Sequence, residues 1–198
     1  MKLAVLTLAA AFAISQSASA QSEKPAPQSD VRPSQQPAAD PFAGVPAAKA
    51  DDVNSIDHLL AALYDVISGP PGPRDWDRFR SLFIPTARLT SATKAPDGSV
   101  RVHPNTVEDY ATRGGAYFLK NGFFEKAVVN RVFTFGSIAQ VLSSYESRHA
   151  LGETPFARGI NGIQLLNDGK RWWIVSIFWD EERPDNPLPK DFTKVPDM

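Results

Sequence analysis

The residue best placed by type and position to do acid–base chemistry is Asp180. It ends the aromatic segment KRWWIVSIFWDEE, residues 170–182, and is followed by Glu181 and Glu182. A carboxyl group that turns inward at the edge of a sheet acquires a raised pKa and can act as a general acid or base. The simpler alternative is a solvated strand end whose charges face water, and it is the commoner situation.

A reaction that uses Asp180 as a base also needs a donor for the negative charge that develops on the substrate. Tyr64 is the candidate, since it lies late in a predicted helix with an apolar face. Aromatic residues at helical spacing are usually core residues, but a buried phenol needs a hydrogen-bond partner, so a polar spot is expected near them. The helical aromatic residues expected to line the interior are Tyr64, Trp76, Tyr110 and Tyr117.

Two further segments place polar side chains within apolar strands, SYESRHA at 144–150 and FARGINGIQ at 156–164. A few fixed polar groups in an apolar surrounding are typical of a small-molecule site. The structural alternative is a network in which Glu146 pairs with an arginine and Arg158 stacks on Trp179. The ligand-binding candidates from these segments and from the last strand are Glu146, Arg148, Asn161, Trp172, Ser176 and Phe178.

Composition excludes several kinds of function. There is no cysteine, and the three histidines, His58, His103 and His149, lack the spacing of metal ligands, so we expect no metal and no cofactor. No Ser-His-Asp arrangement, phosphate-binding loop or dinucleotide glycine pattern occurs. A formal net charge of −1 provides no basic surface for nucleic acid.

The N-terminus has the pattern of a secretory signal peptide. Lys2 precedes an apolar run over residues 3–14, and Ala18-Ser19-Ala20 supplies small residues for cleavage near Ala20. The apolar run is shorter than the roughly 20 residues of a spanning helix, so we expect no membrane insertion after cleavage. The predicted location is the periplasm or the outside of a bacterial cell.

The rest of the chain divides by composition into three parts. Residues 21–50 contain six prolines and one aromatic residue and are expected to form a disordered tether. Residues 51–186 have the size of one domain, and residues 187–198 form a proline-rich tail.

The domain begins with three predicted helices. The first runs from an N-cap at Asp51 or Asp52 to the SGPPGP break at 68–73, the second covers residues 74–83, and the third starts at a capping box of Thr106 and Asp109. Gly114 and Gly115 within the third helix indicate a close approach or a kink.

The strands are predicted in two groups. A short pair surrounds the turn PDG at 96–98, and four strands rich in β-branched and aromatic residues follow between 123 and 182. Asp168-Gly169 is expected as a two-residue hairpin turn between the last two strands. That turn would place Gln164 opposite Trp173, Asn161 opposite Ser176 and Arg158 opposite Trp179.

With this register both faces of the last hairpin are apolar, so both should be covered. Helices cover one face, and a second copy of the chain is the most economical cover for the other. Trp172, Phe178 and Asp180 would face the helices, while Trp173 and Trp179 would meet the partner. The homodimer surface would also include Phe133, Phe135, Val141 and Tyr145.

Two motifs together resemble the NTF2-like superfamily, in particular its SnoaL-like bacterial members. The first is Tyr64, a Gly/Pro break and DWDRFRSLFIPTARL at 75–89, with its Phe-x-Pro-x-Ala exit. The second is the hairpin DGKRWWIVSIFW at 168–179. The resemblance covers residues 53–182 and implies an α+β cone, with three N-terminal helices packed on a curved antiparallel sheet and a pocket at the open end. Thr86 stands where many members have an acidic residue.

Three functions remain open. An exported module that binds a small, partly apolar molecule is the first, and a cofactor-independent isomerase or dehydratase with Asp180 and Tyr64 is the second. The third is a structural dimer whose cone is filled by its own side chains. The enzyme hypothesis requires that Asp180 and Tyr64 open into one cavity, near Asn161 or Ser176.

Overall fold

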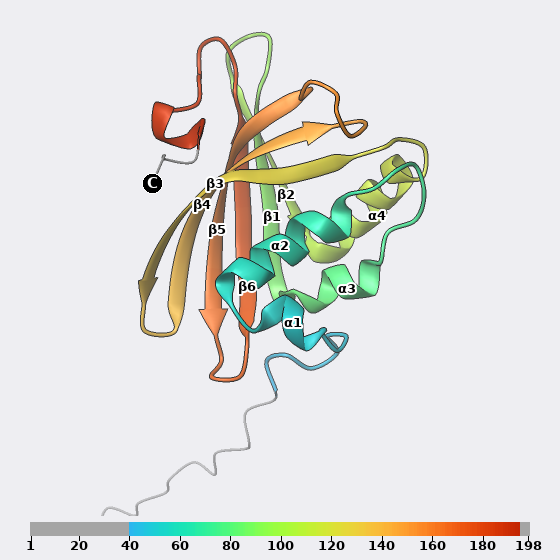
Figure 1. Ribbon diagram of the computed structural model, residues 1–198, viewed down its shortest axis with the longest axis vertical. Coiled ribbons are helices and arrows are strands. Elements are labelled where there is room, and N and C mark those ends of the chain that lie inside the picture. The colour runs from blue at the N-terminus through green and yellow to red at the C-terminus, as the bar shows by residue number, and fades with distance from the viewer. Residues whose placement is uncertain (1–39, 195–198) are drawn as a thin grey trace, which may run out of the picture. The chain divides into compact units, whose positions relative to one another are not determined.

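A curved sheet of six strands organises the part of the chain that the computed structural model describes, residues 40–194 (Figure 1). The predicted signal peptide, residues 1–20, and the predicted tether up to residue 39 lie outside the described residues. Within residues 40–194 no helix has the length and apolar character to cross a membrane.

The strands lie in the order β2-β1-β6-β5-β4-β3. Neighbouring strands are antiparallel except β1 and β6, which are parallel, so the sheet is mixed and not purely antiparallel as expected. The strands are β1 (Phe83–Lys94), β2 (Val100–Thr106), β3 (Phe124–Phe135), β4 (Ile138–Arg148), β5 (Ala157–Asn167) and β6 (Trp172–Glu181).

The helices gather on one side of this sheet (Figure 1). The first predicted helix is divided into α1 (Ala50–Val53) and α2 (Ile56–Ile67), because Ser55 accepts a hydrogen bond from the backbone N–H of His58 and starts a new helix there. α3 (Trp76–Ser81) follows, and α4 (Val107–Phe118) begins at the predicted capping box of Thr106 and Asp109. Since α4 comes after β2, the described helices do not all precede the sheet.

The core lies between the helices and the concave side of the sheet. Leu59, Leu60 and Leu63 of α2 are buried against strand residues such as Ile163 and Ile174. Trp76 packs against the position where a Cβ of Gly115 would stand, at 3.3 Å. The predicted close approach at the two helical glycines is therefore confirmed.

The loop between β5 and β6 is longer than the predicted turn. The Asp168 carboxylate accepts hydrogen bonds from the backbone N–H groups of Lys170 and Arg171, so the loop spans 168–171 and Asn167 pairs with Trp172. As a result Gln164 lies opposite Ser176 and Asn161 lies opposite Trp179. The predicted register, with Gln164 opposite Trp173 and Asn161 opposite Ser176, was wrong.

A β-bulge in β6 also reverses the predicted faces for the residues that follow it. Leu165 pairs with Ile174 and Gln164 with Ser176, which leaves Val175 as an extra residue. An extra residue shifts the alternation of side chains by one. Trp172 and Ile174 therefore face the helices before the bulge, and Ile177, Trp179 and Glu181 do so after it. Phe178 and Asp180, which were expected to point inward, do not.

The outer face of the sheet lacks three residues of the expected dimer surface, and one of them is Trp179, which lines the cavity on the inner side. Val141 and Tyr145 are buried on the concave side. Phe133 and Phe135 are exposed, at 64% and 84% of their surface, and Phe178 joins them at 52%. With Ile138, Leu166 and Val175, the two phenylalanines of β3 line an open groove on the sheet.

The two ends of the described chain pack on the domain. Phe42, from the predicted tether, stacks on Trp173 with ring centroids 4.4 Å apart, and Arg171 lies 3.6 Å from the centre of the same tryptophan ring. At the other end, a 3-10 helix, η1 (Lys190–Phe192), lies next to β3.

Candidate functional site

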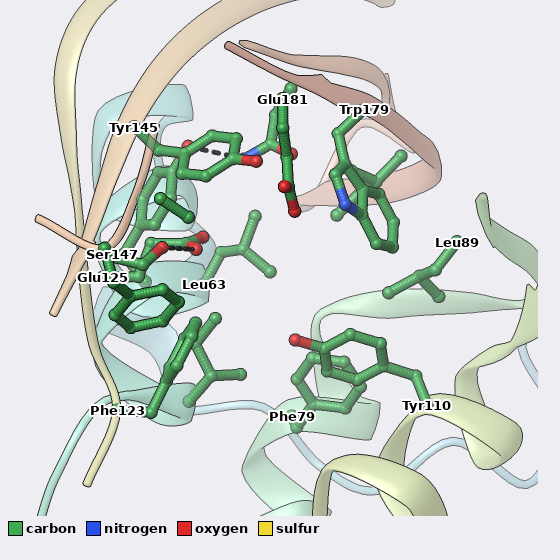
Figure 2. A pocket seen from close by; sticks show the side chains of 16 residues that line it. Leu63, Phe79, Leu89, Tyr110, Phe123, Glu125, Tyr145, Ser147, Trp179 and Glu181 are labelled. Carbon is green, nitrogen blue, oxygen red and sulfur yellow. Dashed lines mark hydrogen bonds between the residues drawn. The ribbon is translucent and has the colours of Figure 1, made fainter. Parts of the chain in front are cut away.

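A cavity of about 200 Å³ lies between the helices and the concave side of the sheet (Figure 2). Its walls come from α2, α3, α4 and five strands, and they are mainly apolar. The lining residues are Leu63, Tyr64, Ile67, Phe79, Leu89, Tyr110, Phe123, Glu125, Tyr145, Ser147, Phe156, Ala157, Asn161, Ile177, Trp179 and Glu181.

Glu125, in the second position of β3, places its carboxylate in this cavity. The Ser147 hydroxyl donates a 2.7 Å hydrogen bond to Oε2 of Glu125 (Figure 2). The main chain of Glu125 is held as well, since its N–H donates to Ser68 Oγ at 3.0 Å and its carbonyl accepts from the same hydroxyl at 3.1 Å. Both the side chain and the backbone of this glutamate are therefore fixed from neighbouring elements.

The environment of Glu125 favours its neutral form. Burial in the apolar wall raises the pKa of the Glu125 carboxyl to about 7; the Ser147 hydrogen bond lowers it and the negative charge of Glu181 raises it. At neutral pH both protonation states are thus populated, which is the condition for a general acid or base.

Three tyrosines surround this carboxylate. Tyr64 is tied into the fold, because its hydroxyl lies 2.6 Å from Ser143 Oγ and accepts a 3.1 Å hydrogen bond from Asn161 Nδ2. The hydroxyls of Tyr110 and Tyr145 have no hydrogen-bond partner among residues 40–194. Figure 2 shows the Tyr110 hydroxyl directed into the cavity, across from Glu125.

The tyrosines remain neutral donors at physiological pH. Burial raises the pKa of Tyr64 to about 12, and it raises the pKa values of Tyr110 and Tyr145 as well. The negative charge of Glu125 adds to the increase in all three. The charge of this one carboxylate therefore raises the pKa values of three tyrosines that come from different elements.

Tyr145 is held against a glycine. A Cβ atom on Gly159 of β5 would lie 2.6 Å from the Tyr145 hydroxyl oxygen and 2.4 Å from the Asp180 carbonyl oxygen. Any side chain at position 159 would displace the tyrosine or the neighbouring strand. A phenylalanine ring makes the same kind of contact at Gly162, where Phe178 lies 2.5 Å from the Cβ position, as expected for glycines in a strand.

The structure brings together three of the residues that the sequence singles out. Tyr64, Tyr110 and Asn161 line the cavity. Tyr117 is partly exposed and lines an adjoining depression that shares Tyr110, Phe123, Phe156 and Trp179 with the cavity. It therefore lies at the entrance.

The structure does not place the carboxylate of Asp180 in the cavity that Tyr64 lines. Its carboxylate lies outside the cavity lining and accepts a 3.1 Å hydrogen bond from Nη2 of Arg183, and this arginine lowers the pKa of Asp180. The geometry required of the Asp180–Tyr64 pair is absent, because the bulge at Val175 turns Asp180 away.

The other candidate site residues make structural contacts outside the cavity. Trp76 and Trp172 pack against the core, and Phe178 is half-exposed on the outer face. Ser176 donates to Gln164 Oε1 at 2.8 Å. Glu146 accepts a hydrogen bond from Arg148 at 2.6 Å, as the structural interpretation expects. Arg158 pairs with Glu182 at 3.1 Å, and the expected stacking of Arg158 on Trp179 does not occur among the described residues.

Sequence reasoning missed the central residues of the cavity: Glu125, Tyr145, Ser147, Trp179 and Glu181. A signal for Glu125 exists, since it alternates with Phe123 and Ala127 in FFEKAVV and so shares the face of two apolar residues. The inward position of Trp179 and Glu181 depends on the bulge at Val175. No residue type in the segment VSIFW predicts that bulge.

No family model matches the chain, and no curated protein matches it. Among solved structures, it is similar to a protein of unknown function with a cystatin-like fold from Nostoc punctiforme, at 12% identity and a TM-score of 0.50. That match covers 68% of this chain and 92% of the other.

An NTF2-like protein of unknown function from Shewanella baltica is also among the neighbours, at 16% identity and a TM-score of 0.42, with 66% of this chain and 98% of that one covered. At 12% identity, the likeness to the Nostoc punctiforme protein shows the fold and nothing of the function. The neighbours of this α+β fold include NTF2-like proteins, as the sequence motifs predict.

Proposed function

We propose that this protein is a cofactor-independent acid–base catalyst, an isomerase or lyase, that acts on a small, partly apolar molecule. The observation that carries the proposal is the placement of the Glu125 carboxylate in an apolar cavity opposite the free hydroxyl of Tyr110. This pocket carboxylate replaces Asp180 in the enzyme hypothesis.

Glu125 in its ionised form would remove a proton from a carbon next to a carbonyl or a similar group. The electron pair of the broken C–H bond forms a C=C bond, the π pair of the carbonyl moves to the substrate oxygen, and Tyr110 or Tyr145 donates a hydrogen bond to that oxygen. Glu125 then returns the proton to another carbon, which isomerises the substrate, or a leaving group departs, which completes an elimination.

A pKa near 7 supports this role. A carboxyl with an ordinary pKa of 4.5 is ionised at neutral pH but is a weak base, whereas Glu125 retains an ionised fraction and binds the abstracted proton more strongly. Tyr64, already bound to Ser143 and Asn161, would hold the site in shape and not contact the substrate.

The test uses 5-nitrobenzisoxazole, whose ring opens when a base removes one carbon-bound proton. We expect turnover that increases with pH through about 7 and falls at least a hundredfold in Glu125→Gln. Asp180→Asn, whose carboxylate lies outside the cavity, is the matched control and should retain the rate.

The second candidate is a binding protein without catalysis, and the apolar lining of the cavity favours it equally. Thermal shifts with apolar metabolites together with no Glu125-dependent turnover would select it. A chain that shows neither would match the third hypothesis, a structural module.

We also infer that the protein works after export, in the periplasm or outside the cell, as a homodimer. The N-terminal pattern supports export, and the exposed Phe133 and Phe135 support pairing through the outer face of the sheet. A mature N-terminus at Gln21 would test export.

A further inference from the structure

The charge inside the cavity is of one sign. Glu125 and Glu181 both line it, and Figure 2 shows the two side chains reaching into the same space from different strands. None of the residues that line this cavity is a lysine, arginine or histidine. A ligand inside the cavity therefore meets two carboxylates and no basic side chain, while Arg113 and His103 line only the depression outside it.

The arginines of the neighbouring strands form ion pairs with glutamates outside the cavity. Arg148 pairs with Glu146, and Arg158 pairs with Glu182 and lies 3.7 Å from Glu146. Within residues 40–194, neither Glu125 nor Glu181 makes an ion pair. The negative charge of the cavity is thus not neutralised by the described part of the chain.

A second observation points to a ligand in this space. Tyr145 is 4% exposed, lines the cavity and has a hydroxyl without a hydrogen-bond partner in the described structure. A polar group in an apolar wall favours a hydrogen-bond partner. A bound molecule that contacts the Tyr145 hydroxyl from the cavity would supply one.

Aromatic rings complete the wall around the two carboxylates. The rings of Phe123 and Phe156 lie 6.2 Å apart, and Trp179 and Tyr110 lie across the cavity from Phe123 (Figure 2). The same four residues line the entrance. Aromatic rings attract organic cations, and they do so most strongly where water is excluded. Carboxylates joined with several aromatic rings form a suitable surrounding for an ammonium group.

We propose that the cavity selects a small organic cation, an amine or quaternary ammonium compound with an apolar part, over neutral and anionic molecules of the same shape. An anion would meet Glu125 and Glu181 without a counter-ion, and a neutral molecule would leave both carboxylates unpaired. The inference rests on the proposed function in that it names the ligand class of the same cavity, but it concerns binding and not turnover.

Binding of a cation is linked to the ionisation of Glu125. The groups that face this carboxyl are Ser147 and Tyr145 from β4, Tyr64 from α2, Tyr110 from α4 and Glu181 from β6, while His149 stacks on Phe156 at the rim. A bound cation stabilises the ionised form of Glu125, so cation binding near pH 7 should release a proton.

Three soluble probes of matched shape test the proposal: choline, 3,3-dimethylbutan-1-ol and 3,3-dimethylbutanoate. Binding to the full-length chain is measured by calorimetry at pH 8 and pH 6. We expect choline to bind at least tenfold more tightly than the alcohol at pH 8, which corresponds to about 1.4 kcal/mol, and the preference to decrease at pH 6. The butanoate should bind most weakly.

The variants Glu181→Gln and Glu125→Gln should each reduce choline affinity at least threefold at pH 8 and leave affinity for the alcohol within twofold. Asp180→Asn should change neither. Equal binding of choline and the alcohol, tighter binding of the butanoate, or binding of none of the three would overturn the proposal.

The two proposals can fail separately. Selective choline binding without turnover of the benzisoxazole rejects acid–base catalysis and keeps the cation site. Turnover that depends on Glu125, with no preference for choline, rejects only the cation site.

Discussion

The hydroxyl of Ser147 in β4 donates a 2.7 Å hydrogen bond to Oε2 of Glu125 in β3, inside an apolar cavity. A hydrogen bond to the ionised form of a carboxyl lowers its pKa, and this one acts against the effect of burial. Ser147 therefore adjusts the pH at which Glu125 can work.

Replacing Ser147 by alanine should raise the pKa of Glu125 above its value of about 7, because the ionised form loses a donor. The measurement is the chemical shift of the Glu125 carboxyl carbon as a function of pH. Ser147→Thr, which keeps the hydroxyl, is the control. A lower pKa in the alanine variant would contradict the assignment.

The stability of the protein should depend on pH through Glu125. Its pKa is about 4.5 in the unfolded chain and about 7 in the fold, so the folded state binds more protons between these values. The free energy of unfolding should fall as pH rises from about 4.5 through about 7. The loss is about 1–3 kcal/mol, since one pKa unit is roughly 1.4 kcal/mol and the residue keeps some contact with solvent.

The substitution Glu125→Gln should remove this decrease in the free energy of unfolding at higher pH. At pH 8 the variant should be more stable than the parent to urea, and at pH 5 the difference should vanish or reverse. A variant that is less stable than the parent at both pH values would show that the ionised carboxylate does not cost stability.

Gly159→Ala should destabilise the fold by about 1–3 kcal/mol, because its methyl group would overlap the Tyr145 hydroxyl and the Asp180 carbonyl. Gly115→Ala is the control. Its Cβ would lie 3.3 Å from the Trp76 ring, a milder contact, and alanine favours the helix by about 1 kcal/mol. Urea unfolding curves compare the two, and equal stability of both variants would argue against the tight packing of Tyr145.

The outer face of the sheet should hold two copies of the chain together. Phe133→Ser with Phe135→Ser removes two exposed rings from the open groove, and light scattering at micromolar concentration should report a dimeric mass for the parent and a monomeric mass for the variant. A replacement of the exposed Leu151, which does not line this groove, serves as the control. A monomeric parent would contradict the expectation.

The elements of this fold follow from local patterns in the sequence. The capping box at Thr106 and Asp109 sets the start of α4, and apolar spacing identifies α2. The strands follow from β-branched and aromatic runs. These features depend on neighbours within a few residues, so a single sequence reveals them.

The site was not predictable in the same way. Whether Asp180 or Glu181 faces the helices depends on one extra residue, Val175, and on the four-residue loop that Asp168 holds. The bulge is set by packing between the strands and the loop by hydrogen bonds to the Asp168 carboxylate, and the Asp-Gly pair alone reveals neither of them. The pKa of Glu125 likewise depends on walls contributed by α2, α4 and β6, far from it in sequence.

The bulge at Val175 has a consequence for how this pocket can change during evolution. Loss of that single codon would remove the bulge and restore plain alternation in β6, and Ile177, Trp179 and Glu181 would still face the helices. A β6 of the same length that paired without the bulge would instead turn Phe178 and Asp180 inward, so one strand sequence allows two alternative pocket linings. Relatives of this chain that keep the length of this strand but lack the bulge would present a different interior to their ligands.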